Sequence, residues 1–92
     1  MAVSQVDIEN AVACLREAGA TRIILFGSAV ESLEAARDLD LACDGIEGWK
    51  FFETSAQLEN ELSVPVDLVP LSPVSRFTRY IEKSGRVLYE RG

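Results

Sequence analysis

Several residue types are absent or scarce in the sequence, and each shortage excludes a class of protein. No histidine is present, which excludes histidine-based acid–base catalysis and histidine-ligated zinc. Two cysteines, Cys14 and Cys43, are too few for the disulfide framework of a short secreted chain, and we expect both to be small buried hydrophobic residues. No apolar run approaches the ~20 residues of a membrane-spanning helix, and the N-terminal segment lacks the basic-then-apolar pattern of a signal peptide. We therefore expect a cytoplasmic protein without a membrane interaction.

The composition is otherwise that of an ordinary globular domain. The 92 residues predict a single domain, 1–92, with 48% hydrophobic and 26% charged residues. The net charge of −6 makes direct binding of nucleic acid through its phosphates unfavourable. Residues 1–67 hold thirteen acids and four bases, whereas residues 68–92 hold five bases and two acids. The basic segment could meet an acidic partner or a phosphate, but the simpler interpretation is a solvated helix face that balances the acidic body.

Apolar periodicity predicts alternating helices and strands. Ser4 is a candidate N-cap with Asp7 three residues on, and Gly19 ends the helix that follows. The run 23–26 is continuous and β-branched, as in a strand buried on both faces. The further expected elements are a helix at 29–36, a strand at 38–43, a helix at 49–62, a strand at 64–69, a helix from 72–73 to Gly85, and a short edge strand at 87–89. This order predicts a small α/β (α+β) layer in which helices flank a mixed β-sheet.

Three carboxylates are the residues that indicate a possible chemistry for this chain. Asp38 and Asp40 alternate with apolar residues, so both side chains leave the same face of their strand. Two carboxylates converging to ~4 Å repel by about 4 kcal/mol at an effective dielectric of 20, and Mg²⁺ offsets such repulsion. If the strand of Asp67 is a neighbour, a third acid joins them, to bind metal or to accept a proton from an attacking hydroxyl. The alternative is a solvated sheet face or edge that carries no ligand.

Gly27 and Ser28 lie where a strand turns into a helix. A glycine there lets the backbone approach an anion, and the free N–H groups at a helix start favour phosphate. Ser28 and Glu31 also match the S-x-x-E capping box, so we expect Ser28 to cap the helix and to contact phosphate as an additional role.

These residues together resemble a known family. Three strings are similar to the signature of the polymerase-β nucleotidyltransferase superfamily: Leu25-Phe26-Gly27-Ser28, then after a spacer of nine residues Asp38-Leu39-Asp40-Leu41, and later Val66-Asp67-Leu68-Val69. Over essentially the whole chain, length and element order resemble its smallest branch, the minimal nucleotidyltransferase (MNT) domains.

The resemblance implies a nucleotidyltransferase (polymerase-β-like) fold and a Mg²⁺–NTP site. It implies that Gly27 and Ser28 hold the β/γ-phosphates of ATP or another NTP, that Asp38 and Asp40 bind metal, and that Asp67 completes the metal site or activates the acceptor hydroxyl. It further implies a toxin–antitoxin pair, in which the MNT antitoxin transfers AMP to a HEPN-domain partner or masks it by binding, within a possible homo- or hetero-oligomer.

Two positions depart from the family pattern. Glu31 stands where an arginine is frequent, and Arg37 stands where a serine or threonine usually precedes the acid pair. Two functions therefore remain open: an active nucleotidyltransferase, or a catalytically degenerate binding subunit that neutralises its partner by contact. An unrelated α/β module with coincidental acids is the third alternative.

Aromatic residues gather in the segment 49–52. Trp49, Phe51 and Phe52 could stack on a base, but aromatic residues at helical spacing are more typical of a core, and we expect them to be buried. In the last helix we expect Val74, Phe77 and Ile81 to face inward.

Overall fold

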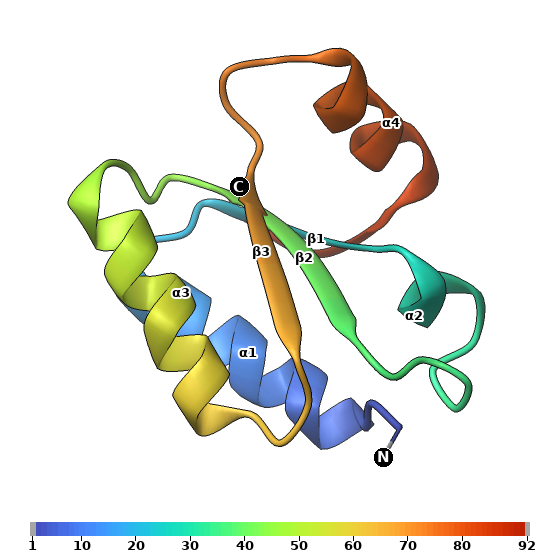
Figure 1. Ribbon diagram of the computed structural model, residues 1–92. Helices are drawn as coiled ribbons and strands as arrows, with labels where there is room; N and C mark the ends of the chain where they lie inside the picture. The colour runs from blue at the N-terminus through green and yellow to red at the C-terminus, as the bar shows by residue number, and fades with distance from the viewer. Residues whose placement is uncertain (1, 92) are drawn as a thin grey trace.

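The computed structural model of the protein describes residues 2–91. Helices and strands alternate in the predicted order (Figure 1). The elements are α1 (Gln5–Ala18), β1 (Arg22–Phe26), α2 (Ser28–Glu31), β2 (Leu39–Asp44), α3 (Trp49–Glu61), β3 (Val66–Pro70), α4 (Arg76–Ser84) and β4 (Arg86–Glu90). In this part of the chain no helix is long and apolar enough to cross a membrane.

The four strands form one mixed sheet with the order β3-β2-β1-β4. Strand β1 is antiparallel to both β2 and β4, whereas β2 and β3 are parallel. Helices α1 and α3 pack together on one face of the sheet, and α4 lies on the opposite face (Figure 1). The predicted α/β class with a mixed sheet flanked by helices is therefore confirmed.

Alternate residues of β1 build two separate cores, which explains its unbroken apolar run. Ile23 and Leu25 belong to the large core under α1 and α3, and Ile24 and Phe26 belong to a small core with Ile81 of α4. A strand with helices on both faces has no solvated side, so every position favours an apolar residue. The expected burial on both faces is thus confirmed.

Local signals correctly predicted the first helix. The Ser4 hydroxyl accepts a hydrogen bond from the backbone N–H of Asp7, and the Asp7 carboxylate accepts one from the backbone N–H of Ser4. Gly19 adopts φ +111°, and its N–H closes the last turn. Both caps are formed by residues within one turn of the helix end, so they do not depend on the rest of the fold.

The boundaries of two other helices differ from the prediction. Helix α2 stops at Glu31 instead of Ala36, because Ser32 is extended and its side chain accepts the N–H of Ala35 in a separate turn. Helix α4 begins at Arg76, not at 72–73, because Ser75 and Thr78 form the capping box.

The expectation that the aromatic residues would be buried was largely wrong. Trp49 is 79% exposed and Phe52 is 67% exposed, and only Phe51 is partly buried. Helix α3 faces the core through Thr54 and Leu58, and in its first turn only Phe51 packs against that core. Ile81 of α4 is buried as expected, but Phe77 of the same helix and Val74, which precedes the helix, are exposed.

Candidate functional site

Sheet pairing gathers the predicted acids near one end of β2. Asp40 pairs with Phe26 of β1 on one side and with Asp67 of β3 on the other. The parallel pairing shows that the strand of Asp67 is a neighbour of β2, which is the condition under which a third acid joins the other two. Asp38 precedes β2 by one residue and is exposed. The alternation along β2 places Asp40 on the face of Ala42, which belongs to the core beneath α4.

Asp40 is the most buried of the three carboxylates. It is half-buried, whereas Asp38 and Asp67 are exposed. Burial, followed by the negative charges of Asp67 and Asp38, raises the pKa of Asp40 above its ordinary value. The side chain therefore lies in a position where an added cation would relieve both the burial cost and the repulsion.

Gly27 brings the turn after β1 directly against this carboxylate. The residue adopts φ +78° and ψ −155°, a backbone conformation that only glycine occupies readily. A Cβ at this position would lie 3.1 Å from Cγ of Asp40 and would collide with its carboxylate oxygen. The glycine turn and the acid are therefore in contact, as a single site requires.

Ser28 occupies a different place from the one its sequence pattern predicts. Gly27 is the N-cap of α2, and Ser28 is the first helical residue, without a side-chain cap hydrogen bond. The expected capping box with Glu31 is therefore wrong, because the box needs its serine outside the helix. The exposed Ser28 hydroxyl remains accessible beside the N–H groups of the first turn.

Phe77 of α4 lies at the same end of β1. Its ring meets Phe26 edge-to-face with 5.8 Å between centroids, and half of the Phe77 side chain stays exposed. Sequence periodicity predicted that Phe77 would face inward but contained no signal for its position at this site. The pairing brings α4 to the edge of the surface that carries Asp40.

The two residues that depart from the family pattern are exposed to solvent. Glu31 is exposed, and it is the one charged residue of α2. Arg37 is exposed just before the acid pair. Arg76 and Arg79 are exposed on α4, as expected for a solvated helix face.

The donor set suits a hard cation, although the three acids do not surround one point. Carboxylate oxygens are ligands that Mg²⁺ prefers, and the turn at Gly27 lies directly beside the Asp40 carboxylate. Among residues 2–91, no three His, Cys, Asp or Glu side chains are grouped closely enough to surround an ion. The acids thus lie near enough to perturb Asp40 without forming a closed cage.

The chain is similar in structure to several solved proteins, although its sequence matches no protein-family model and no curated protein. One is a complex of a tri-AMPylated Shewanella oneidensis HEPN toxin with its MNT antitoxin, with 24% identity and a TM-score of 0.73 over 94% of this chain and 71% of that one. A toxin–antitoxin structure with AMP-PNP has 26% identity and a TM-score of 0.72, over 89% of this chain and 73% of that one. A chain assigned to the minimal nucleotidyltransferases has 26% identity and a TM-score of 0.71, with 88% of each chain covered.

Proposed function

From the minimal nucleotidyltransferase fold of this chain, we propose that it is a Mg²⁺-dependent nucleotidyltransferase that transfers AMP from ATP to a partner protein. The observation that carries the proposal is the contact around Asp40. Gly27 touches the Asp40 carboxylate, and Asp67 is paired beside it in the neighbouring strand. A phosphate-binding turn and a pair of acids at one point are the elements that phosphoryl chemistry needs.

Each residue of the site has a role in this proposal. Asp38 and Asp40 hold Mg²⁺, with Asp67 as a further ligand, and the bound ion would neutralise charge on the triphosphate. The backbone at Gly27 and the N–H and hydroxyl of Ser28 hold the β/γ-phosphates. In this proposal Asp67 also accepts the proton of the attacking hydroxyl. The new bond joins that oxygen to the α-phosphorus, and pyrophosphate leaves.

The acceptor in this proposal is a HEPN-domain protein. The Shewanella oneidensis structure pairs an MNT antitoxin with an AMPylated HEPN toxin, and the fold of this chain is similar. We infer that this chain is likewise an antitoxin that forms a hetero-oligomer with a HEPN-domain toxin in the cytoplasm. Transfer of AMP to the partner would inactivate it.

Thermal unfolding with ATP and Mg²⁺, singly and together, tests the nucleotide site. Ligand at 100 times its Kd should stabilise the fold by ~2.7 kcal/mol. We expect a shift that needs both components and is lost in Asp38→Asn/Asp40→Asn. The matched control is Asp44→Asn/Glu47→Gln, which removes the same charge at the other end of β2 and in the loop that follows it. A shift that survives in the first variant would refute the metal assignment.

Transfer itself is measured with ATP labelled at the α-phosphate and a HEPN-domain protein encoded beside this chain. We expect label in the partner with the wild type and none with Asp40→Asn, while the complex still forms. Label that persists at the wild-type rate with Asp40→Asn would contradict the assigned catalytic role.

A degenerate binding subunit is the second candidate, and Glu31 is the observation that favours it. Helix α2 has no basic residue in either its first or last turn, and Glu31 would repel a triphosphate at Ser28. In that case the partner is neutralised by contact alone. Neutralisation would then survive when Asp38, Asp40 and Asp67 are all replaced by asparagine, whereas the active enzyme would lose it.

A further inference from the structure

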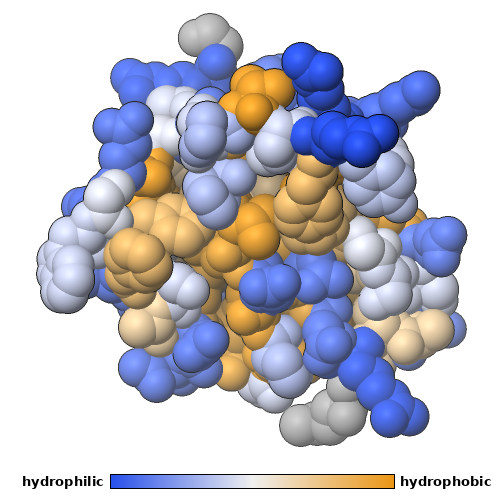
Figure 2. Space-filling view, turned by 45° about the horizontal axis from the view of Figure 1, so that its top comes forward, coloured by the Kyte–Doolittle hydropathy of each residue, from blue (hydrophilic) through white to orange (hydrophobic). Residues whose placement is uncertain are grey.

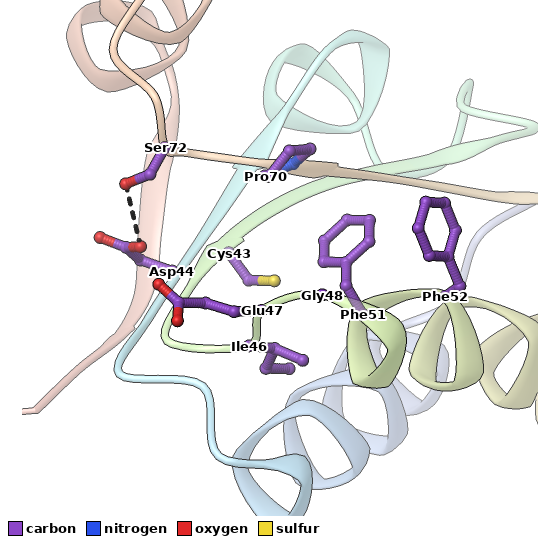
Figure 3. Close-up of a pocket in the computed structure, with 9 residues that line it drawn as sticks. All are labelled: Cys43, Asp44, Ile46, Glu47, Gly48, Phe51, Phe52, Pro70 and Ser72. Carbon is purple, nitrogen blue, oxygen red and sulfur yellow. Dashed lines mark hydrogen bonds between the residues drawn. The ribbon is translucent and has the colours of Figure 1, made fainter.

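A second candidate site lies at the opposite end of β2 from Asp40. The loop between β2 and α3, the start of α3 and the end of β3 enclose a pocket of about 320 Å³ (Figure 3). We call it the β2–α3 pocket. Asp44 and Glu47 line it on one side, and Phe51, Phe52 and Pro70 line it on the other.

The aromatic wall of this pocket is continuous with exposed apolar surface. Phe51 and Phe52 meet edge-to-face with 6.0 Å between ring centroids, and Phe52 and the neighbouring Trp49 are mostly exposed. Hydrophobic residues extend from the α3 side across the centre of the face in Figure 2. Exposed aromatic anchors beside a pocket are typical of protein interfaces, where they supply much of the binding energy.

The acidic wall determines what kind of side chain the pocket accepts. Oδ1 of Asp44 accepts hydrogen bonds from the backbone N–H of Gly45 at 3.1 Å and from the Ser72 hydroxyl at 3.3 Å. These bonds hold the carboxylate at the mouth of the pocket, and Glu47 lies beside it (Figure 3). A flat cation between carboxylates and aromatic rings gains both charge-assisted hydrogen bonds and cation–π attraction. Arginine satisfies both better than lysine does.

The pocket is distinct from the proposed nucleotide site. Asp44 is four residues along β2 from Asp40, which corresponds to roughly 13 Å. Cys43, which also lines the pocket, belongs to the core under α1 and α3, whereas Asp40 is on the α4 face. The carboxylates at the mouth would repel a nucleotide phosphate.

We propose that the β2–α3 pocket binds an arginine side chain of a partner protein, while Trp49 and Phe52 pack against apolar surface around that arginine. The inference rests on the proposed function in one respect, that this chain acts on a second protein. The acidic part of the chain, residues 1–67, favours the approach of a basic partner surface.

The test uses the full chain labelled with ¹⁵N and the peptide acetyl-Gly-Arg-Gly-amide. Its citrulline analogue has nearly the same shape without the charge. We expect saturable shifts of the Gly45, Gly48 and Phe51 amides with the arginine peptide, and binding weaker by about tenfold or more with citrulline. Asp44→Asn/Glu47→Gln should weaken arginine binding to a similar extent. Asparagine at 44 can still accept the bonds from Gly45 and Ser72, so this variant keeps its fold.

Matched controls separate the pocket from general charge attraction. Asp38→Asn/Asp40→Asn makes the same change in net charge and should bind the arginine peptide as the wild type does. No saturable shift, equal binding of citrulline, or equal loss in both variants would overturn the proposal. AMP shifting the same amides would also overturn it, since the pocket would then bind a base. The ATP–Mg²⁺ unfolding shift is measured without peptide, so failure of either proposal is recognised independently.

Discussion

Two glycines in nearly the same conformation allow the energetic effect of the contact between Gly27 and Asp40 to be measured. Gly27 and Gly48 each precede a helix as an N-cap without a side-chain cap hydrogen bond. Their dihedrals are φ 78°, ψ −155° and φ 61°, ψ −136°. A Cβ at Gly48 would meet nothing within 4 Å, whereas one at Gly27 would collide with Asp40. Replacement by alanine therefore differs between them mainly in that collision.

The expected magnitudes follow from this difference. Alanine in this region of backbone space costs roughly 1–3 kcal/mol, and both variants incur that cost. Gly27→Ala must in addition turn the Asp40 side chain away, which adds about 1–2 kcal/mol of rotamer and packing strain. Gly27→Ala should thus be the less stable variant by about that amount, which is roughly 4–16 °C in melting temperature for a domain of this size.

The assay monitors thermal and urea unfolding by circular dichroism, and the measurements are repeated in an Asp40→Ala background. There the carboxylate is gone, so Gly27→Ala should cost about as much as Gly48→Ala. The same samples are then scanned with ATP and Mg²⁺, where Gly27→Ala should lose the stabilising shift and Gly48→Ala should keep it. Equal destabilisation by the two alanines in the wild-type background would refute the contact between Gly27 and Asp40.

Three further predictions concern single side chains. Asp40→Asn should stabilise the chain at pH 7 without metal by roughly 1 kcal/mol, the repulsion of like charges about 4–5 Å apart in water. Because the pKa of Asp40 is raised in the folded state, ionisation of this carboxyl lowers the stability of the wild type as pH rises above the ordinary value of 3.8. The stability gained by Asp40→Asn should therefore vanish near pH 3, where the wild-type carboxyl is protonated in both states. Ser4→Ala should cost about 1 kcal/mol in unfolding free energy by removing the α1 cap, whereas Ser28→Ala should cost less because Ser28 makes no cap bond. Burial raises the pKa of the Cys43 thiol to about 11, so a thiol reagent at pH 8 should react with it in urea and not in the native state.

Each of the three predictions on single side chains would be contradicted by one specific result. Destabilisation by Asp40→Asn at pH 7 would mean that the carboxylate makes a favourable contact in the folded state. Equal losses for the two serine variants would disprove the difference in capping. Rapid native-state labelling of Cys43, with unfolding excluded by circular dichroism, would contradict its burial.

Some of the molecule could be read from the sequence because the interactions involved are short in range. The Ser4–Asp7 capping box and the Gly19 end of α1 depend on residues within a few positions of each other. The alternation that turns Asp40 away from the face of Leu39 and Leu41 is a property of any strand, whereas Asp38 lies just before β2. The unbroken apolar run of β1 needed only the assumption that helices cover both faces of the sheet.

The tertiary structure decided what depends on pairing and on approach between distant segments. The parallel register of β2 and β3 places Asp67 beside Asp40, and the contact of Gly27 with Asp40 depends on how β1 meets β2. Sequence periodicity cannot distinguish an aromatic residue in a core from one beside it, so the exposure of Trp49 and Phe52 became evident only in the folded chain. The sequence therefore predicted which residues are candidates for the site, and the long-range contacts determined which of them meet.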